Sequence, residues 1–374
     1  MPRNTVLVVG AAGKVGFSSV QYLAASGIVN RLYLIDIRSL ESATNNAILI
    51  SAFYDKYPLI KPIQHDIMDI DKTAKILREI KPTVIFNAAT IFSSMFYKDI
   101  AKKIIKKRGL TFKAHVPGHT IAKDLVPIYK LMQAVKESGI ETKVVNIAFP
   151  DHTHPILAKV DLSPTVGGGN IDLIVSGMKR VLADEMGIAS SRINITMVAH
   201  HAITVWPPEE VPYFIKIIVD GVDITKQFDK SQLDHYLFKA QRLQENDVDN
   251  TPMAAASGIR NVLAILNDEG CVRHCPGPNG LLGGYPTYLD SEGAKVILPR
   301  ELSMEKATEI NIAGMRRDGI EQIENDGTVI FTKECIAFME EVLNLRGWEK
   351  MKIEEAELMA KELLNAYTQL AEKA

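Results

Sequence analysis

The first half of the chain alternates short apolar runs with longer amphipathic stretches. Apolar runs of strand length lie at 5–9, 31–36, 63–67, 83–89 and 143–148, and the intervals between them include helical patterns at 40–53, 71–80 and 121–138. Strands separated by helices in this rhythm predict a parallel, doubly wound sheet. Such a sheet binds its ligands at the carboxyl ends of its strands.

The second half mixes longer helices with strands that follow one another directly. The pattern predicts a helix at 170–187, a strand at 192–198, a strand pair at 211–222, a helix at 251–268, a hairpin around 283–286, a strand at 327–332 and a closing amphipathic helix at 353–371. We therefore expect an α/β doubly wound domain at 1–150 with an insertion at 91–120, an α+β domain at 151–348 and a C-terminal helix at 349–374.

The composition is that of an ordinary globular protein. Charged residues make up 24% of the 374 residues, hydrophobic residues 47%, and the net charge is −2. Because there is no basic excess, we expect no nucleic-acid partner. No apolar stretch reaches the ~20 residues of a membrane span, and the first strand begins at once, so we expect a cytoplasmic location with no membrane partner.

The first apolar run leads straight into three glycines, Gly10, Gly13 and Gly16, and the next one ends in Asp36. The first glycine permits a tight turn, the second lets the backbone approach a pyrophosphate, and the third lets the helix pack on the strand. The carboxylate would accept hydrogen bonds from ribose hydroxyls, so NAD is favoured over NADP. Arg38 weakens that preference slightly. The layout predicts a dinucleotide-binding Rossmann domain.

Further cofactor contacts are expected at two places. The loop itself contributes Ala12, Lys14 and Val15, which lie at the positive end of the helix that follows. At the end of the fourth predicted strand, small residues would let the cofactor lie against the chain, and these are Asn87, Ala88 and Ala89. A simple packing role for the two alanines is equally compatible with the pattern.

The insertion at 91–120 contains a short basic amphipathic helix. Its cations are Lys98, Lys102, Lys103, Lys106, Lys107 and Arg108, followed by Lys113. One interpretation is a solvated helix face. The other is a lid whose cations meet an anionic small-molecule substrate, with Arg108 among the substrate-binding residues.

A histidine pair, His200 and His201, ends the strand at 192–198, and Asp172 opens the helix before it. Such residues can form a His–Asp dyad. The aspartate would fix the tautomer of the imidazole and raise its basicity, and the other ring nitrogen would exchange a proton with a hydroxyl or carbonyl group.

The order and spacing of these motifs resemble those of the NAD-dependent lactate/malate dehydrogenase family. The chain would be a remote and divergent member of it. The resemblance extends over roughly residues 5–310 and includes the glycine loop, Asp36, Asn170-Ile-Asp172 and His201. It implies that His201 is the catalytic acid/base, that Asp172 orients it, and that Thr251 and His200 line the substrate pocket. It further implies hydride transfer between NAD and a 2-hydroxy acid or related hydroxy compound, in a homodimer or homotetramer.

The chain departs from this family where the substrate carboxylate is held. Val175, or Gly177 under another alignment, stands where the family has an arginine that forms a two-pronged pair with that carboxylate. Phe149 stands where the family has an asparagine before proline, and the basic insertion replaces the family's catalytic loop. The identity of the substrate therefore stays open.

Two other functions fit the sequence less well. The first ninety residues also resemble an extended short-chain dehydrogenase/epimerase, but its Tyr-x-x-x-Lys motif occurs only as Tyr57 to Lys61, which is too early in the chain. A non-catalytic NAD-binding sensor is the second alternative, because the carboxylate-binding arginines are missing.

We predict no metal cofactor. Cys271 and Cys275, with His274 between them, lack a second pair that would complete a tetrahedral site, and with only three cysteines we expect no disulfide framework. One alternative stays open, in which loop histidines converge on a divalent ion, and this set comprises His115, His119, His152, His154, His200 and His201.

Overall fold

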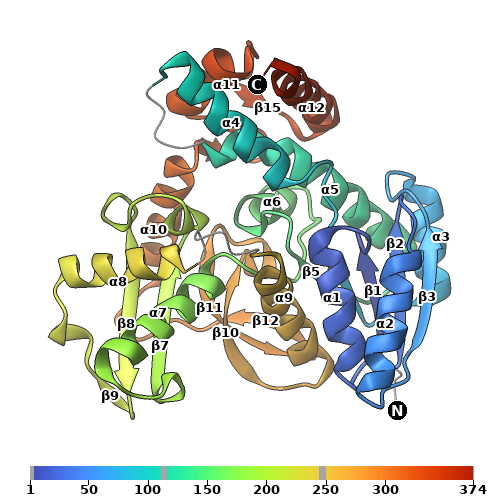
Figure 1. Ribbon diagram of the computed structural model, residues 1–374, viewed down its shortest axis with the longest axis horizontal. Helices are drawn as coiled ribbons and strands as arrows, with labels where there is room; N and C mark the ends of the chain where they lie inside the picture. The colour runs from blue at the N-terminus through green and yellow to red at the C-terminus, as the bar shows by residue number, and fades with distance from the viewer. Residues whose placement is uncertain (1–3, 111–115, 244–249, 374) are drawn as a thin grey trace.

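The computed structural model describes residues 4–110, 116–243 and 250–373, and its strands form three sheets (Figure 1). The first sheet is parallel, with the order β3-β2-β1-β4-β5-β6. Its strands are β1 (Thr5–Val9), β2 (Arg31–Asp36), β3 (Leu59–Gln64), β4 (Val84–Asn87), β5 (Lys143–Asn146) and β6 (Val166–Gly167). The order reverses between β1 and β4, where such sheets leave a crevice for a ligand.

Helices cover both faces of this sheet. They are α1 (Lys14–Ala25), α2 (Glu41–Phe53), α3 (Ile70–Ile80), α4 (Ser94–Arg108), α5 (Ile121–Ser138) and α6 (Pro150–Ala158). Strand β1 is buried along its whole length, and its side chains alternate between two cores: Val6 and Val8 enter one, Leu7 and Val9 the other. The predicted doubly wound parallel sheet is therefore confirmed.

The edge strand β3 begins earlier than its apolar pattern suggested. We predicted a strand at 63–67, whereas the structure pairs Leu59–Gln64 with β2. Most of its residues are exposed or half-buried because it lies at the edge of the sheet. An edge strand has no second neighbour to bury it, so its sequence lacks the continuous apolar run of β1.

The second sheet is antiparallel, in the order β10-β11-β7-β8-β9 with β12 paired to β11. Its strands are β7 (Ile193–Ala199), β8 (Tyr213–Val219), β9 (Val222–Asp223), β10 (Cys271–Pro276), β11 (Gly284–Asp290) and β12 (Gly293–Val296). The helices of this region are α7 (Ile171–Met186), α8 (Lys230–Arg242), α9 (Thr251–Leu266) and α10 (Met304–Arg317). This arrangement confirms the predicted α+β region, and α9 packs against α1 of the first domain (Figure 1).

A small third sheet and two helices complete the chain. These are β13 (Ile320–Ile323), β14 (Val329–Phe331), β15 (Lys350–Met351), α11 (Lys333–Leu343) and α12 (Ala356–Lys373). Helix α12 packs on α4 and α5 through the buried side chains of Leu363 and Tyr367, and Tyr367 Oη lies 2.6 Å from His119 Nε2. This segment shares a hydrophobic core with the first domain.

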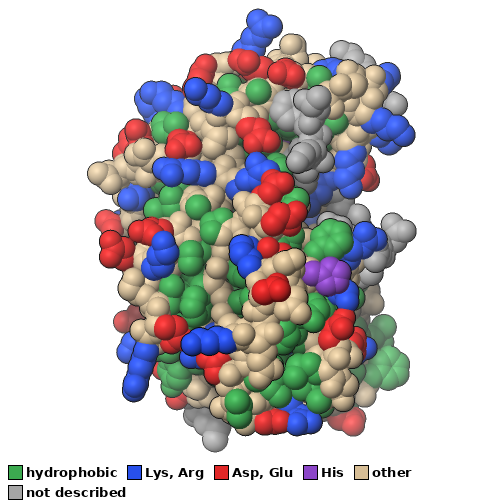
Figure 2. All heavy atoms as spheres, turned by 90° about the vertical axis from the view of Figure 1, so that its left-hand side faces the viewer, with side chains coloured by type: hydrophobic (Ala, Val, Ile, Leu, Met, Phe, Trp, Pro, Cys, Tyr) green, Lys and Arg blue, Asp and Glu red, His purple; other side chains and the backbone are tan. Residues whose placement is uncertain are grey.

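The surface gives no sign of a membrane span. On the face that Figure 2 shows, acidic and basic side chains are interspersed with apolar ones and do not gather into a patch of one sign. No helix within the described residues is long and apolar enough to cross a bilayer.

Candidate active site

The glycine loop packs tightly against the end of β4. Gly10 has a φ of +79°, and a Cβ there would lie 2.7 Å from the backbone nitrogen of Ala89. A Cβ on Gly16 would lie 2.1 Å from the carbonyl oxygen of Gly10, so only glycine lets α1 approach the strand this closely. The first turn of α1, which contains Lys14 and Val15, follows directly.

The carboxylate of Asp36 is buried at the end of β2, and several donors hold it. Its Oδ2 accepts a hydrogen bond of 2.9 Å from the backbone N–H of Ala12, and Arg38 donates through Nε at 3.0 Å and Nη2 at 3.1 Å. Burial alone would raise the pKa of Asp36, but the bonds from Arg38 and Ala12 outweigh it and lower the pKa below its ordinary value. The carboxylate is therefore ionised and links the second strand to the glycine loop.

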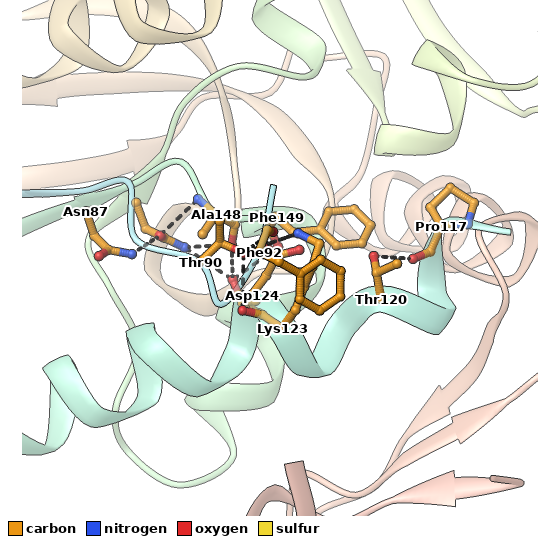
Figure 3. Close-up of polar contacts among 11 residues, drawn as sticks. Asn87, Thr90, Phe92, Pro117, Thr120, Lys123, Asp124, Ala148 and Phe149 are labelled. Atoms are coloured by element: carbon orange, nitrogen blue, oxygen red, sulfur yellow. Dashed lines mark hydrogen bonds and ion pairs between the residues drawn. The ribbon is translucent and has the colours of Figure 1, made fainter. Parts of the chain in front are cut away.

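Two asparagines join the ends of β4 and β5. Asn87 donates to Asn146 Oδ1 at 2.8 Å, and Asn146 donates in turn to the carbonyl oxygen of Ala148 at 3.2 Å (Figure 3). Ala88 and Ala89 are half-buried and lie beside Gly10. The predicted cofactor residues of β1, β2 and β4 thus lie together at the carboxyl edge of the sheet.

A buried ion pair lies at the same edge, on the first turn of α5. Lys123 Nζ is 2.6 Å from Asp124 Oδ1, and Thr90 donates to the same oxygen at 2.8 Å (Figure 3). The ammonium group also lies 5.8 Å from the ring centroids of Phe92 and Tyr97. Sequence reasoning missed this pair, although two adjacent charges in the otherwise apolar first half of the helix were a signal that they were buried and paired.

The second part of the site is centred on Asp318, a fully buried carboxylate at the end of α10. Its backbone N–H caps the helix by donating to the carbonyl oxygen of Gly314, and its own carbonyl oxygen accepts from Gly118 at 2.6 Å. Gly319 follows with a φ of +100°, which turns the chain into β13. This turn fixes the direction of the carboxylate.

Three imidazoles surround one oxygen of this carboxylate. Asp318 Oδ2 lies 2.5 Å from His201 Nδ1, 3.3 Å from His152 Nε2 and 3.5 Å from His200 Nδ1. His152 and His200 are fully buried, whereas the His201 side chain is 16% exposed. His201 is therefore the one imidazole of the three that an incoming molecule can reach.

A second buried carboxylate is hydrogen-bonded to the backbone of His201. Asp151, on the first turn of α6, accepts the backbone N–H of His201 at 3.0 Å and is also hydrogen-bonded by the side-chain amide of Asn170. The residues before α6 and α7 have unusual conformations, with φ of +47° at both Phe149 and Asn170. Such strain in non-glycine residues concentrates at functional sites.

Phe149 closes one side of this cluster. Its ring meets His152 edge-on at a centroid distance of 4.4 Å and His201 at 4.8 Å. The residue that replaces the family's asparagine therefore packs directly on the histidines and makes their surroundings apolar.

The electrostatics of the cluster favour a charged pair. Burial lowers the pKa of His201 and raises that of Asp318, but their mutual attraction and hydrogen bond dominate: the pKa of His201 is raised, and that of Asp318 is held well below its usual range. Burial lowers the pKa of His200 well below its ordinary value, so His200 is neutral. Burial raises the pKa of Asp151.

The same cluster contains donor atoms spaced for a metal. Ligand atoms of His152, His200 and Asp318 all lie within 4.8 Å of one another. However, His200 Nδ1 already accepts the backbone N–H of Ala202 at 3.2 Å, and Asp318 is hydrogen-bonded to His201. The other polar atoms of these side chains, His152 Nδ1, His200 Nε2 and Asp318 Oδ1, are buried and have no hydrogen-bond partner within the described residues. The donor set is therefore compatible both with a proton-sharing network and with a coordination site.

Of the remaining histidines in the proposed metal set, His119 bonds to the carbonyl oxygen of Val116 and to Tyr367, and His154 to the carbonyl oxygen of Gly277 and to Asn146. Neither belongs to the Asp318 cluster. His115 lies outside the described residues.

The structure does not bring together the predicted pair His201 and Asp172. Asp172 accepts hydrogen bonds from Ser257 at 2.7 Å and from Arg260 at 2.9 Å, both on α9. The reason is geometric. Asp172 lies on the face of α7 that packs on α9, whereas the carboxylate of Asp318, at the end of α10, lies beside His201. No pattern in the sequence distinguishes Asp318, which follows an ordinary helix end.

The other predicted substrate residues are placed as follows. Arg108 ends α4 and donates to the carbonyl oxygens of Glu341 and Val342 at the end of α11. Thr251 begins α9 and is half-buried. His200 lies inside the cluster, on the buried side of His201. Within the described residues, the side-chain hydrogen bonds of Arg108 are thus with a neighbouring helix and not with the histidine cluster.

Comparison with known proteins finds the same architecture elsewhere. The family model of the NAD dependent epimerase/dehydratase family matches residues 6–110. No curated protein sequence matches. Among solved structures, the lactate dehydrogenase MGS-M5 from a Medee basin deep-sea metagenome library is 17% identical with a TM-score of 0.60, covering 85% of this chain and 98% of its own. The fold is that of the lactate and malate dehydrogenases.

Two further structures support the same assignment. The malate dehydrogenase of Picrophilus torridus is 18% identical with a TM-score of 0.59, and the match covers 84% of this chain and 96% of that one. The lactate dehydrogenase of Cryptosporidium parvum, solved with lactic acid and nicotinamide adenine dinucleotide, is 18% identical with a TM-score of 0.58, over 85% of this chain and 99% of that one. The resemblance seen in the sequence is therefore confirmed at the level of the fold.

Proposed function

We propose that this protein is an NAD-dependent oxidoreductase. Support comes from the glycine loop, where the contacts at Gly10 and Gly16 are too close for a side chain, and from the ionised Asp36 beside it. The match of residues 6–110 to an NAD-dependent family and the cofactor-bound structures among its neighbours support the same cofactor. The ribose hydroxyls would be held by Asp36, and the pyrophosphate would lie at the N-terminus of α1.

One observation carries the proposal of catalysis. His201, the partly exposed member of the histidine cluster, is bonded through Nδ1 to buried Asp318, and it contacts Phe149 and Asp151, which follow β5 of the sheet that carries the glycine loop. Its Nε2 is then the nitrogen that exchanges a proton with the substrate oxygen. Asp318, in place of Asp172, keeps the tautomer fixed and stabilises the imidazolium.

In the oxidation direction, neutral His201 takes the proton of a substrate hydroxyl. NAD, when bound, supplies the hydride acceptor. In the reduction direction, protonated His201 donates to the carbonyl oxygen, and its raised pKa keeps it protonated to higher pH than a free histidine. Phe149 excludes water on one side of the ring.

We propose a 2-hydroxy acid or a related anionic hydroxy compound as substrate. The family arginine is missing, and Val175 at its place is buried. One cation of the insertion acts on the site electrostatically: the charge of Lys98 in α4 opposes the protonation of His201 and so acts to lower its pKa. Lys98 is therefore the residue that we expect to attract the substrate carboxylate.

A two-stage experiment tests the proposal. Calorimetry of NAD and NADP binding to the wild type and to Asp36→Ala comes first, and we expect NAD to bind and the variant to lose about tenfold or more in affinity. Turnover with a panel of hydroxy and keto acids follows, with His201→Gln as the test and Lys306→Gln, an exposed substitution on α10, as the matched control. NAD binding without turnover of any compound would instead support the sensor alternative.

The epimerase alternative has one observation in its favour, the family-model match to the first domain. Its catalytic motif finds no support in the structure, because Tyr57 is 78% exposed just before the edge strand β3. The glycine loop is common to both families, so the match does not distinguish them.

A further inference from the structure

A cavity of about 590 Å³ lies between α7, α9 and the second sheet, apart from the histidine cluster. None of the cluster residues His152, His200, His201 and Asp318 lines it. Its volume is within the range of about 300–1,000 Å³ that is typical of small-molecule sites. It is therefore large enough for a metabolite.

The cavity wall has an excess of positive charge. Its basic residues are Lys179, Arg180, Arg260 and Arg273, and the acidic residue in the wall is Asp172. Two of the cations are bonded to carboxylates that do not line the cavity, Arg180 to Asp184 and Arg273 to Glu269. Asp172 therefore faces several cations within the cavity.

Two of these cations have bonding capacity left. Within the described part of the chain, no carboxylate lies within ion-pair distance of Lys179. The Nε of Arg273 is buried and has no hydrogen-bond partner. A buried donor without a partner is costly, and an anion in the cavity would satisfy it.

The excess positive charge also contributes to lowering the pKa of two groups in the cavity wall, Lys179 and His274. Burial lowers the pKa of Lys179, and Arg260 and Arg273 lower it further by repulsion. Burial, with repulsion from Lys179 and Arg260, lowers the pKa of His274 to about 3, so His274 is neutral. An anion bound beside Lys179 would offset this repulsion and favour its charged form.

The remaining wall has an apolar and a polar part. The apolar part includes Val175, Val272, Leu298 and Pro299, and the polar part Ser176, Ser190, Asn194 and Thr196. A ligand that fits this wall has a small organic body and a compact anionic group. Arginine and lysine donors that converge from three elements match a phosphate, which accepts several charged hydrogen bonds at once.

We propose that this cavity binds a small organic phosphate at a site separate from the dinucleotide and histidine sites. The phosphate would contact Lys179, Arg260 and Arg273, and the organic part the apolar wall. This inference goes beyond the proposed oxidoreductase function and does not depend on it.

Calorimetry on the full-length protein tests the proposal, with glycerol 3-phosphate, inorganic phosphate and succinate as probes and with NAD at saturation. We expect the phosphate ester to bind most tightly. Lys179→Gln should weaken it by about tenfold or more, and Arg273→Gln likewise. Lys306→Gln, on an exposed part of α10, and His201→Gln should leave the affinity unchanged.

Several outcomes would overturn the proposal. The first two are that no phosphate compound binds saturably, or that this binding disappears when NAD is saturating. The others are that Lys306→Gln weakens the binding of the phosphate ester as much as Lys179→Gln does, or that succinate binds more tightly than the phosphate ester. A Lys179→Gln protein that has lost its fold is recognised by circular dichroism, and Arg273→Gln then provides the test. Loss of turnover in His201→Gln with retained phosphate binding would separate this site from the catalytic one.

Discussion

Replacing Asp318 by asparagine should destabilise the protein in a pH-dependent way. The side chain is fully buried, and its Oδ2 lies 2.5 Å from His201 Nδ1, against 3.3 Å and 3.5 Å for the other two imidazoles. The pair with His201 therefore dominates. Breaking a buried ion pair costs about 3–5 kcal/mol. We expect the lower end of this range, because His201 is partly exposed and can lose its proton in the variant.

The direction of the pH dependence of the unfolding free energy follows from the pKa shifts of His201 and Asp318. The folded pKa of His201 is raised, so its contribution to the free energy of unfolding is complete below about pH 6.5 and is lost as the pH rises through the folded pKa. The folded pKa of Asp318 is lowered, so its contribution is present above about pH 4 and is lost as the pH falls through the folded value. The decrease in the free energy of unfolding caused by Asp318→Asn should thus be largest between about pH 4 and 6.5 and become smaller in alkaline solution.

Urea unfolding at a series of pH values measures this effect, and Asp172→Asn is the matched control. Asp172 is bonded to Ser257 and Arg260 on α9, so its variant should not share the alkaline decrease. Histidine-selective NMR titration gives an independent measurement, in which the pKa of His201 should fall in Asp318→Asn and stay unchanged in Asp172→Asn. The opposite pattern would show that Asp172 is the partner of His201 and refute the assignment.

Three further predictions concern other parts of the structure. Gly314→Ala should lower the free energy of unfolding by about 1–3 kcal/mol, because the new Cβ would lie 2.3 Å from His200 Cβ; urea unfolding checks this. Arg108→Ala should cost about 1 kcal/mol through the lost bonds to the end of α11 yet leave KM unchanged, and a raised KM would restore its predicted substrate role. Lys98→Gln should raise KM for an anionic substrate with little change in kcat, and it should raise the pKa of His201 in the same NMR titration.

Much of the fold follows from local patterns. The alternation of Val6, Leu7, Val8 and Val9 between two cores, the helix at 121–138 and the glycine loop are all set by neighbours in sequence, which is why periodicity predicted them. Edge strand β3 was harder to delimit, because exposed positions carry no apolar signal.

The candidate site, like the fold, was predicted from the sequence only in part. The sequence by itself determined the glycine loop with Asp36 and the place of His201 at the end of a strand. Only the tertiary structure decided which carboxylate holds that histidine. Asp318 lies 117 residues further along the chain and reaches His201 because α10 packs against His200 at Gly314. Asp172, closer in sequence, faces α9 instead. A partner across such a distance depends on which helices pack together, and periodicity shows only that a helix has a buried face, not what that face contacts.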